Sequence, residues 1–167
     1  MVDLSSAVRR GHPIAFGIFT VFALIVAIIA SAVVADFNSN GQPSSKLVRD
    51  STRFMVFAGW WGFLFSLVYI GLFLSGIGGF LSSIASHAVF IFLTWVFWLA
   101  GSAALSTKVG SADCSADDNG IPDCSALRAI CAFGWIGWIE LTCMLGVICY
   151  LAYKAFSGGR GMNDGFA

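Results

Sequence analysis

The stretch FGIFTVFALIVAIIA, residues 16–30, contains no charged residue, and its apolar side chains do not alternate with polar ones. The uncharged run extends from Pro13 to Val34, before Asp36. A bilayer core of about 30 Å is crossed by a helix of about 20 apolar residues. Backbone groups must pair within such a segment, and a barrel strand would need period-two alternation. The sequence therefore predicts a transmembrane helix over 13–34, with Pro13 at its first helical position.

Three further stretches are long and apolar enough to span a membrane, at about 54–75, 83–105 and 127–153. Only 11% of the 167 residues are charged, whereas a soluble domain carries about 25%. So few charges cannot cover a water-facing surface. We expect an all-α integral membrane protein, a four-transmembrane-helix bundle that forms one domain over 1–167. The net charge of zero and the lack of a basic run argue against nucleic-acid binding.

The connections between the spans indicate which side of the membrane each end occupies. Outer loops are expected at about 35–53 and 106–126, and only GIGGFLS joins the second and third spans. Lys and Arg counts do not decide the orientation, but RRGH precedes the first span, which favours cytoplasmic N- and C-termini. Cys114 and Cys124 are the two cysteines outside the spans, and disulfides persist in oxidising compartments. This places the loop that holds them on the lumenal or extracellular side.

The polar stretch CSADDNGIPDCS, residues 114–125, allows two interpretations. Its Asn-Gly and Pro favour a turn that closes a Cys114–Cys124 ring. As a calcium loop beginning at Ser115 it would supply Asp117, Asn119 and Asp123, but its first and last positions lack carboxylates. We favour the disulfide ring and expect no metal, with calcium as the remaining alternative.

Apart from Arg128 at the outer end of the fourth span, Glu140 is the one charged residue inside a predicted span. An ionisable group at this depth is costly and is a candidate functional residue by default. It could hydrogen-bond between helices or between copies, with Thr94, Thr20 or Thr142 as neighbours, or it could relay protons or ions. We favour the hydrogen-bonding role, because a transporter usually needs several polar groups at midplane.

All six tryptophans occur in the second, third and fourth spans, at similar distances from the predicted outer ends. They form a layer within the outer leaflet, deeper than an interfacial belt. The layer could fill a wide bundle, face lipid, or provide a surface for a sterol, a lipid tail or another copy. Its members are Trp60, Trp61, Trp95, Trp98, Trp135 and Trp138.

Small residues repeat every four positions in each span, which allows helices to pack closely in lipid. The first span contributes Ala23, Ala27 and Ser31; the second Gly62, Ser66, Gly71 and Ser75; the third Ala100 and Ala104; the fourth Thr142 and Gly146.

This order of parts, together with the third-span segment FIFLTWVFWLAGSAALST, residues 90–107, resembles the MARVEL domain. Among its members, it looks like the small fungal proteins of the kind linked to non-classical export and eisosomes in yeast. The resemblance covers nearly the whole chain. It implies a role in organising membrane microdomains or vesicle membranes through contacts with sphingolipid and sterol. It implies no catalytic residues.

The sequence shows no nucleophile–base–acid set, P-loop, dinucleotide fingerprint or metal-ligand spacing. We therefore expect a non-enzymatic tetraspan protein that forms homo-oligomers in the plasma membrane or in secretory or vesicle membranes. Its partners would be membrane lipids, with no small-molecule substrate. We expect no cofactor, and the alternative is that a lipid or sterol is bound. The alternative is a small channel or transporter that uses Glu140.

Overall fold

The computed structural model describes residues 4–41, 43, 45–75, 84–110, 114 and 123–157, and they form four helices. These are α1 (Leu4–Ser39), α2 (Lys46–Ser75), α3 (Ile84–Val109) and α4 (Cys124–Ser157). Each helix contains a segment long and apolar enough to cross a membrane: Pro13–Ser39, Lys46–Leu72, Ser86–Val109 and Cys124–Tyr150. The prediction of an all-α bundle with four membrane-spanning helices is confirmed.

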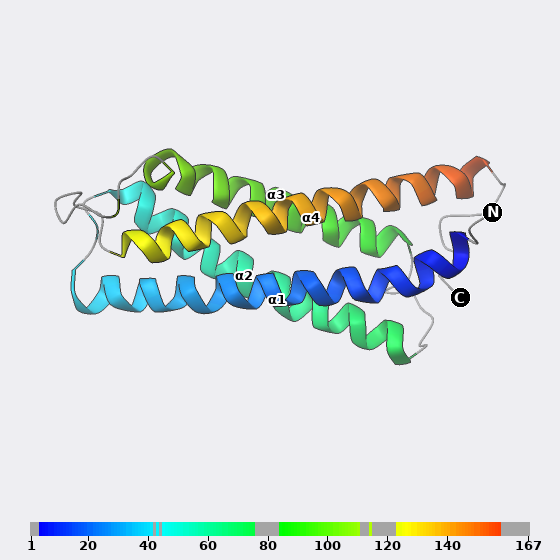
Figure 1. Ribbon diagram of the computed structural model, residues 1–167, viewed down its shortest axis with the longest axis horizontal. Helices are drawn as coiled ribbons and strands as arrows, with labels where there is room; N and C mark the ends of the chain where they lie inside the picture. Colours follow the sequence, from blue (N-terminus) through cyan, green and yellow to red (C-terminus); the bar gives the residue numbers. More distant parts are fainter. Residues whose placement is uncertain are drawn as a thin grey trace.

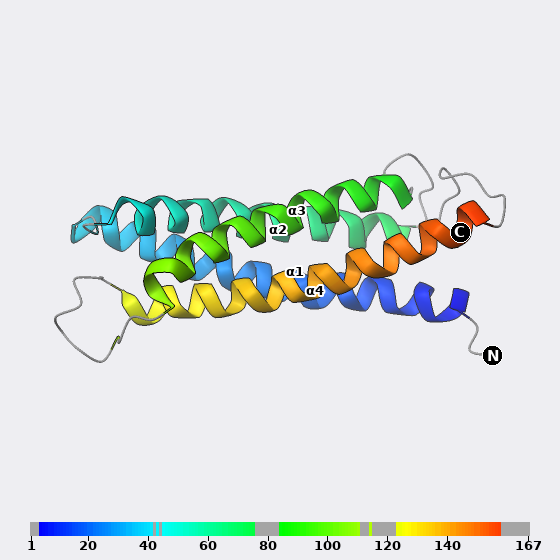
Figure 2. The ribbon, with the colours of Figure 1, turned by 90° about the horizontal axis from the view of Figure 1, so that it is seen from above.

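The helices run up and down along one long axis (Figure 1). Helix α1 packs against α2 and α4, and α3 packs against the same two helices. The view from above shows that the helices cross (Figure 2): near the middle α2 and α3 lie on one side and α1 and α4 on the other, whereas where α4 begins, α1 lies beside α2 and α3 beside α4. The beginning of α1 and the end of α4 lie at one end of the bundle (Figure 1). The α1–α2 connection and the beginning of α4 lie at the other end, which we call the disulfide end.

The helices are longer than the predicted spans, so the connections at the disulfide end are shorter than the predicted outer loops. Helix α1 continues to Ser39 and α2 begins at Lys46, within the loop predicted over 35–53. The Ser45 hydroxyl accepts a 3.5 Å hydrogen bond from the Val48 amide and caps α2. Gly41 has a φ of 119°, which suits the residue after a helix. Hydropathy measures the part of a helix in hydrocarbon, whereas its polar ends continue into the headgroup region.

Pro13 lies inside α1 and not at its first position, because α1 begins at Leu4. The expectation that a helix starts at Pro13 is therefore wrong. Polar residues precede Pro13 in the sequence, so the helix begins outside the apolar run on which the prediction was based. Membrane helices tolerate an internal proline when the freed carbonyl finds another partner.

The α1–α2 contact is built from small residues. Ala23 and Ala27 of α1 and Ser66 of α2 are fully buried, and a Cβ on Gly62 would lie 3.3 Å from that of Ala23. A Cβ on Gly59, which the four-residue repeat did not identify, would lie 2.8 Å from the Ala27 backbone nitrogen. The two backbones therefore approach as closely as a glycine permits.

Two of the other predicted small-residue positions, Gly71 and Gly146, lie outside the interfaces between helices of this chain. No atom lies within 4 Å of a Cβ built on Gly71 or Gly146. Ser75 and Ala100 are exposed, while Ser31 and Ala104 are half-buried. Glycines that do meet another helix include Gly101 and Gly134, beside Met55, and Gly137, whose backbone lies against the ring of Trp98.

Candidate functional site

Four tryptophans bond to hydroxyl groups on neighbouring helices, and these bonds connect all four helices in turn. The indole N–H groups donate from Trp60 to Ser31 (3.3 Å), from Trp61 to Thr94 (3.1 Å), from Trp95 to Thr142 (2.8 Å) and from Trp135 to Ser106 (2.8 Å). The pairs join α2 to α1, α2 to α3, and α3 to α4 twice. In lipid such hydrogen bonds contribute about 0.6 kcal/mol each on average.

Three of the acceptor hydroxyls also donate to the carbonyl one turn earlier in their own helix. Thr94 donates to Phe90 (2.8 Å), Thr142 to Trp138 (2.8 Å) and Ser106 to Ser102 (2.7 Å). Each hydroxyl has one proton, and that proton is used in the hydrogen bond to the carbonyl. The oxygen is therefore left with lone pairs for the indole N–H, which fixes the direction of the hydrogen bond between the helices.

Trp98 and Trp138 form the inner part of the tryptophan layer. Trp98 is fully buried, and its ring centroid lies 5.0 Å from that of Phe19. Trp138 packs against Trp95 and Trp135, at centroid distances of 5.7 and 5.5 Å. Neither indole N–H has a hydrogen-bond partner among the described residues. Trp98 has no exposed surface in this chain, so it fills the bundle and cannot contact lipid.

Trp60 is the tryptophan most open to the surroundings, with 38% of its surface exposed, and the other four of the layer are half-buried. The six therefore do not form one uniform contact face. The layer runs from a buried centre at Trp98 to an outer edge at Trp60.

Glu140 lies on α4, half-buried, in the apolar middle of the bundle. Its Oε2 atom is buried and has no hydrogen-bond partner within the described part of the chain. The three predicted neighbours are occupied elsewhere. Thr20 donates to the Phe16 carbonyl (2.6 Å). Thr94 and Thr142 accept the hydrogen bonds of Trp61 and Trp95. A carboxyl group so placed can accept a hydrogen bond from another molecule or carry a proton.

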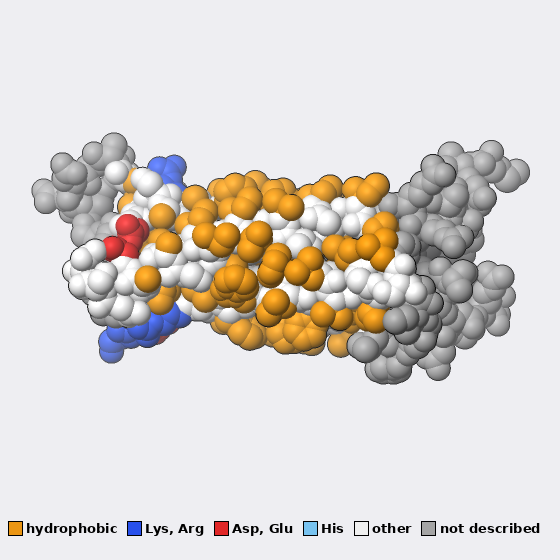
Figure 3. All heavy atoms as spheres, turned by 90° about the horizontal axis from the view of Figure 1, so that it is seen from below, with side chains coloured by type: hydrophobic (Ala, Val, Ile, Leu, Met, Phe, Trp, Pro, Cys, Tyr) orange, Lys and Arg blue, Asp and Glu red, His pale blue; other side chains and the backbone are white. Residues whose placement is uncertain are grey.

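On the face seen in Figure 3, apolar side chains cover the middle of the bundle. Large exposed apolar residues occur on every helix, for example Ile18, Leu64, Val89 and Ile139. Apart from Glu140, the charged side chains that the structure describes lie at the disulfide end. The surface therefore matches hydrocarbon over the middle of the bundle and headgroups at this end.

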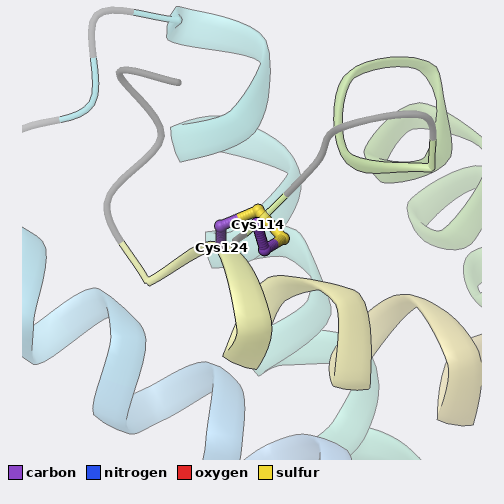
Figure 4. Close-up of a disulfide and its surroundings, with 2 residues drawn as sticks. All are labelled: Cys114 and Cys124. Carbon is purple, nitrogen blue, oxygen red and sulfur yellow. A yellow bond between two sulfur atoms is a disulfide. The ribbon is translucent and has the colours of Figure 1, made fainter. Parts of the chain in front are cut away.

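Cys114 and Cys124 form a disulfide, with their Cα atoms 5.5 Å apart (Figure 4). The predicted pairing is confirmed. Of the stretch considered as a calcium loop, only its ends and Asp123 are described, so that alternative lies outside the described residues. No group of three or more His, Cys, Asp or Glu side chains within the described part could hold a metal.

Two carboxyl groups meet beside the disulfide. Burial raises the pKa of Asp123 above its ordinary value of 3.8, and the charge of Asp36 and its hydrogen bond to Asp123 raise it further. Asp36 also accepts a hydrogen bond from Asn40 (2.5 Å). The Asp36–Asp123 contact links the end of α1 to the beginning of α4, and the sequence did not predict it.

The comparisons with known proteins agree with this architecture. The family model for MARVEL, described as a membrane-associating domain, matches residues 8–153. No curated protein and no solved structure matches the chain.

Proposed function

The chain belongs to the MARVEL family of membrane-associating domains, and on this premise we propose that it organises membranes by associating with itself and with lipids. In this proposal the protein is non-enzymatic and needs no cofactor. Its partners are other copies of the chain and membrane lipids, with sterols and sphingolipids as the preferred classes. The likeness to small fungal members of the family is part of the proposal.

The observation that carries this proposal is the distribution of polar groups. Trp61, Trp95 and Trp135 satisfy their indole N–H groups inside the bundle, and apolar side chains cover the outside. Such a molecule meets its surroundings through van der Waals contact with lipid and with other membrane helices. That is the kind of contact by which a membrane-organising protein would act.

Small exposed residues offer places where two copies could approach closely. Gly71 on α2 and Gly146 on α4 are exposed, and no atom lies within 4 Å of a Cβ built on either. Because an added Cβ meets no other atom there, we expect a larger side chain at either position to leave the fold of the single chain unchanged. We therefore expect Gly146→Leu or Gly71→Leu to reduce the number of chains per particle, if close helix contact joins the copies.

Subunit counting by single-molecule photobleaching in reconstituted bilayers tests this expectation. Val147→Leu, at an exposed apolar position beside Gly146, is the matched control and should leave the count unchanged. Single chains in the unsubstituted protein at every density would contradict self-association.

We also propose that the termini are cytoplasmic and that the disulfide end faces an oxidising compartment. This orientation follows from the Cys114–Cys124 pairing, because disulfides persist in such compartments. The plasma membrane and secretory or vesicle membranes are the proposed locations.

A second candidate function is a small channel or transporter built on Glu140. The buried Oε2 atom without a partner among the described residues favours it. Ion or proton flux into liposomes, measured with the unsubstituted protein and with Glu140→Gln, distinguishes the two functions. Flux that depends on Glu140 would support the channel, whereas no flux with intact self-association would support membrane organisation.

A further inference from the structure

Six aromatic residues form a continuous seam between α2 and α3. Phe54 contacts Phe97 at a ring-centroid distance of 6.0 Å, and Phe97 contacts Phe57 at 5.6 Å and Trp61 at 5.9 Å. Trp61 lies 4.2 Å from Phe65, which lies 5.6 Å from Phe90. We call these residues, Phe54, Phe57, Trp61, Phe65, Phe90 and Phe97, the aromatic seam. Ring contacts of this kind contribute about 0.5–1.5 kcal/mol per pair beyond the area they bury.

The aromatic seam is open to the surroundings on its outer side. Phe57 and Phe65 are 47% and 40% exposed, and Phe54, Trp61 and Phe97 are half-buried. The contact between α1 and α2 differs, because small residues bring those backbones together. Between α2 and α3 the surface therefore presents a strip of aromatic rings to the membrane, running from near the disulfide end toward the other end.

Cationic side chains stand at the disulfide end of the seam, on both of its helices. Arg53 is exposed and lies one turn before Phe57 on α2. Lys46 lies two turns before Arg53 on the same face of α2. Lys108 is exposed in the last turn of α3, two turns beyond Gly101 on the face that meets Phe54. Figure 3 shows Lys and Arg side chains gathered at this end of the apolar band.

None of these three cations pairs with a carboxylate among the residues that the structure describes. Arg49 differs, because its Nε atom lies 3.0 Å from an Asp50 oxygen. These cations have no carboxylate partner in the described part of the chain and lie at the polar end of an apolar strip, where a nearby anion would attract them. Arg53 and Lys108 thus supply charge where the aromatic seam supplies apolar contact.

We propose that the α2–α3 face binds an anionic phospholipid, with its phosphate beside Arg53 and Lys108 and an acyl chain along the aromatic seam. The inference rests on the proposed function, since it adds anionic phospholipids to the sterols and sphingolipids that the protein is proposed to gather. Charge complementarity selects this occupant. A sterol has no phosphate to meet the cations, and a zwitterionic headgroup brings its own amine close to them.

The full chain in nanodiscs tests the proposal. Discs are prepared from phosphatidylcholine alone or with phosphatidylglycerol, and native mass spectrometry counts the lipids that stay bound. We expect selective retention of phosphatidylglycerol, with the relative affinity falling about fivefold for each charge removed, or about 25-fold for Arg53→Gln with Lys108→Gln.

Arg128→Gln is the matched control, because it removes an exposed cation from the same end of the bundle but from α4. It should leave retention of phosphatidylglycerol unchanged. Equal retention of both phospholipids would overturn the proposal, and so would an equal loss in Arg128→Gln and in the double variant. Retention of added sterol in place of phosphatidylglycerol would overturn it as well.

Subunit counting on the same discs separates this inference from the proposed function. If self-association persists without selective retention of phosphatidylglycerol, the lipid site is wrong and the membrane-organising role stands. If phosphatidylglycerol is retained by single chains only, the lipid site is right and the proposed self-association is wrong.

Discussion

The indole N–H of Trp95 on α3 donates a 2.8 Å hydrogen bond to the hydroxyl of Thr142 on α4. The same hydroxyl donates to the Trp138 carbonyl, also at 2.8 Å. The pair therefore joins two helices through a hydroxyl that already donates its proton to a carbonyl of its own helix. The Trp61–Thr94 and Trp135–Ser106 pairs repeat this arrangement, and the Trp60–Ser31 bond joins α2 to α1. Polar groups in the membrane thus hold the helices together and leave the outside apolar.

We expect Trp95→Phe and Thr142→Val each to destabilise the bundle, because each removes one partner of this hydrogen bond. The coupling energy from the double-mutant cycle should be about 0.6 kcal/mol, the average for such bonds in membranes. Unfolding free energies in bicelles provide the measurement. Thr107→Val is the control, since that exposed hydroxyl bonds only to the Ala104 carbonyl of its own helix. Strictly additive effects would show that the bond contributes nothing.

Gly59→Ala should separate α1 from α2. The added Cβ would lie 2.8 Å from the backbone nitrogen of Ala27 and 2.9 Å from its Cα, and backbone atoms cannot move aside alone. Overpacking of this kind costs about 1–3 kcal/mol. Gly71→Ala on the same helix meets no atom within 4 Å and should be neutral or slightly stabilising. Thermal unfolding in detergent compares the two variants, and equal midpoints would contradict the close α1–α2 contact.

Removal of the disulfide should loosen the end of the bundle where α4 begins. Cys114 and Cys124 are separated by 10 positions, and a ring of this size contributes about 2–3 kcal/mol by restricting the unfolded chain. We expect Cys114→Ser with Cys124→Ser to lower the unfolding free energy by that amount. Cys143→Ser, which removes an exposed free thiol from α4, should have little effect. Maleimide labelling of Cys114 or Cys124 without reductant would show that the pair is not bonded in membranes.

The Asp36–Asp123 contact predicts a pH-dependent stability. The pKa of Asp123 is raised in the folded state, so folding favours the protonated acid. This contribution is complete below the ordinary pKa of 3.8 and is lost as the pH rises through the folded-state pKa. Asp123→Asn should therefore raise the melting temperature at pH 7, and the gain over the unsubstituted protein should shrink below pH 4.

Asparagine also tolerates the positive φ of 55° at this position, so the substitution adds no backbone strain. Asp50→Asn is the control, because Asp50 pairs with Arg49 and its neutralisation brings no gain. A gain for Asp123→Asn that is the same at every pH would argue against repulsion between the two carboxylates.

The four helices and the disulfide followed from the sequence because both are local properties. Uncharged length marks a span, and the polar ring between two cysteines marks a loop. Helix ends were harder to predict: α2 begins at Lys46 and not near Phe54. Beyond the hydrocarbon, hydropathy no longer separates helix from loop, and the Ser45 cap decides where the helix starts.

The roles of individual side chains in the site depended on how the helices are rotated about their axes. Trp98 and Trp60 have similar predicted depths, yet one is fully buried and the other is 38% exposed. Gly59 and Gly71 are equally small, but only Gly59 faces α1. Spacing along one helix does not determine which face meets a neighbour, so the tryptophan–hydroxyl pairs and the Asp36–Asp123 contact could not be predicted.

The central claim is tested most directly by counting the chains in particles that an amphipathic polymer extracts from membranes. Polymer extraction keeps the surrounding bilayer, so copies that associate in the membrane stay together. The membrane-organising account predicts that most particles contain two or more chains at low expression. Particles that hold one chain each, whatever the expression level, would contradict it.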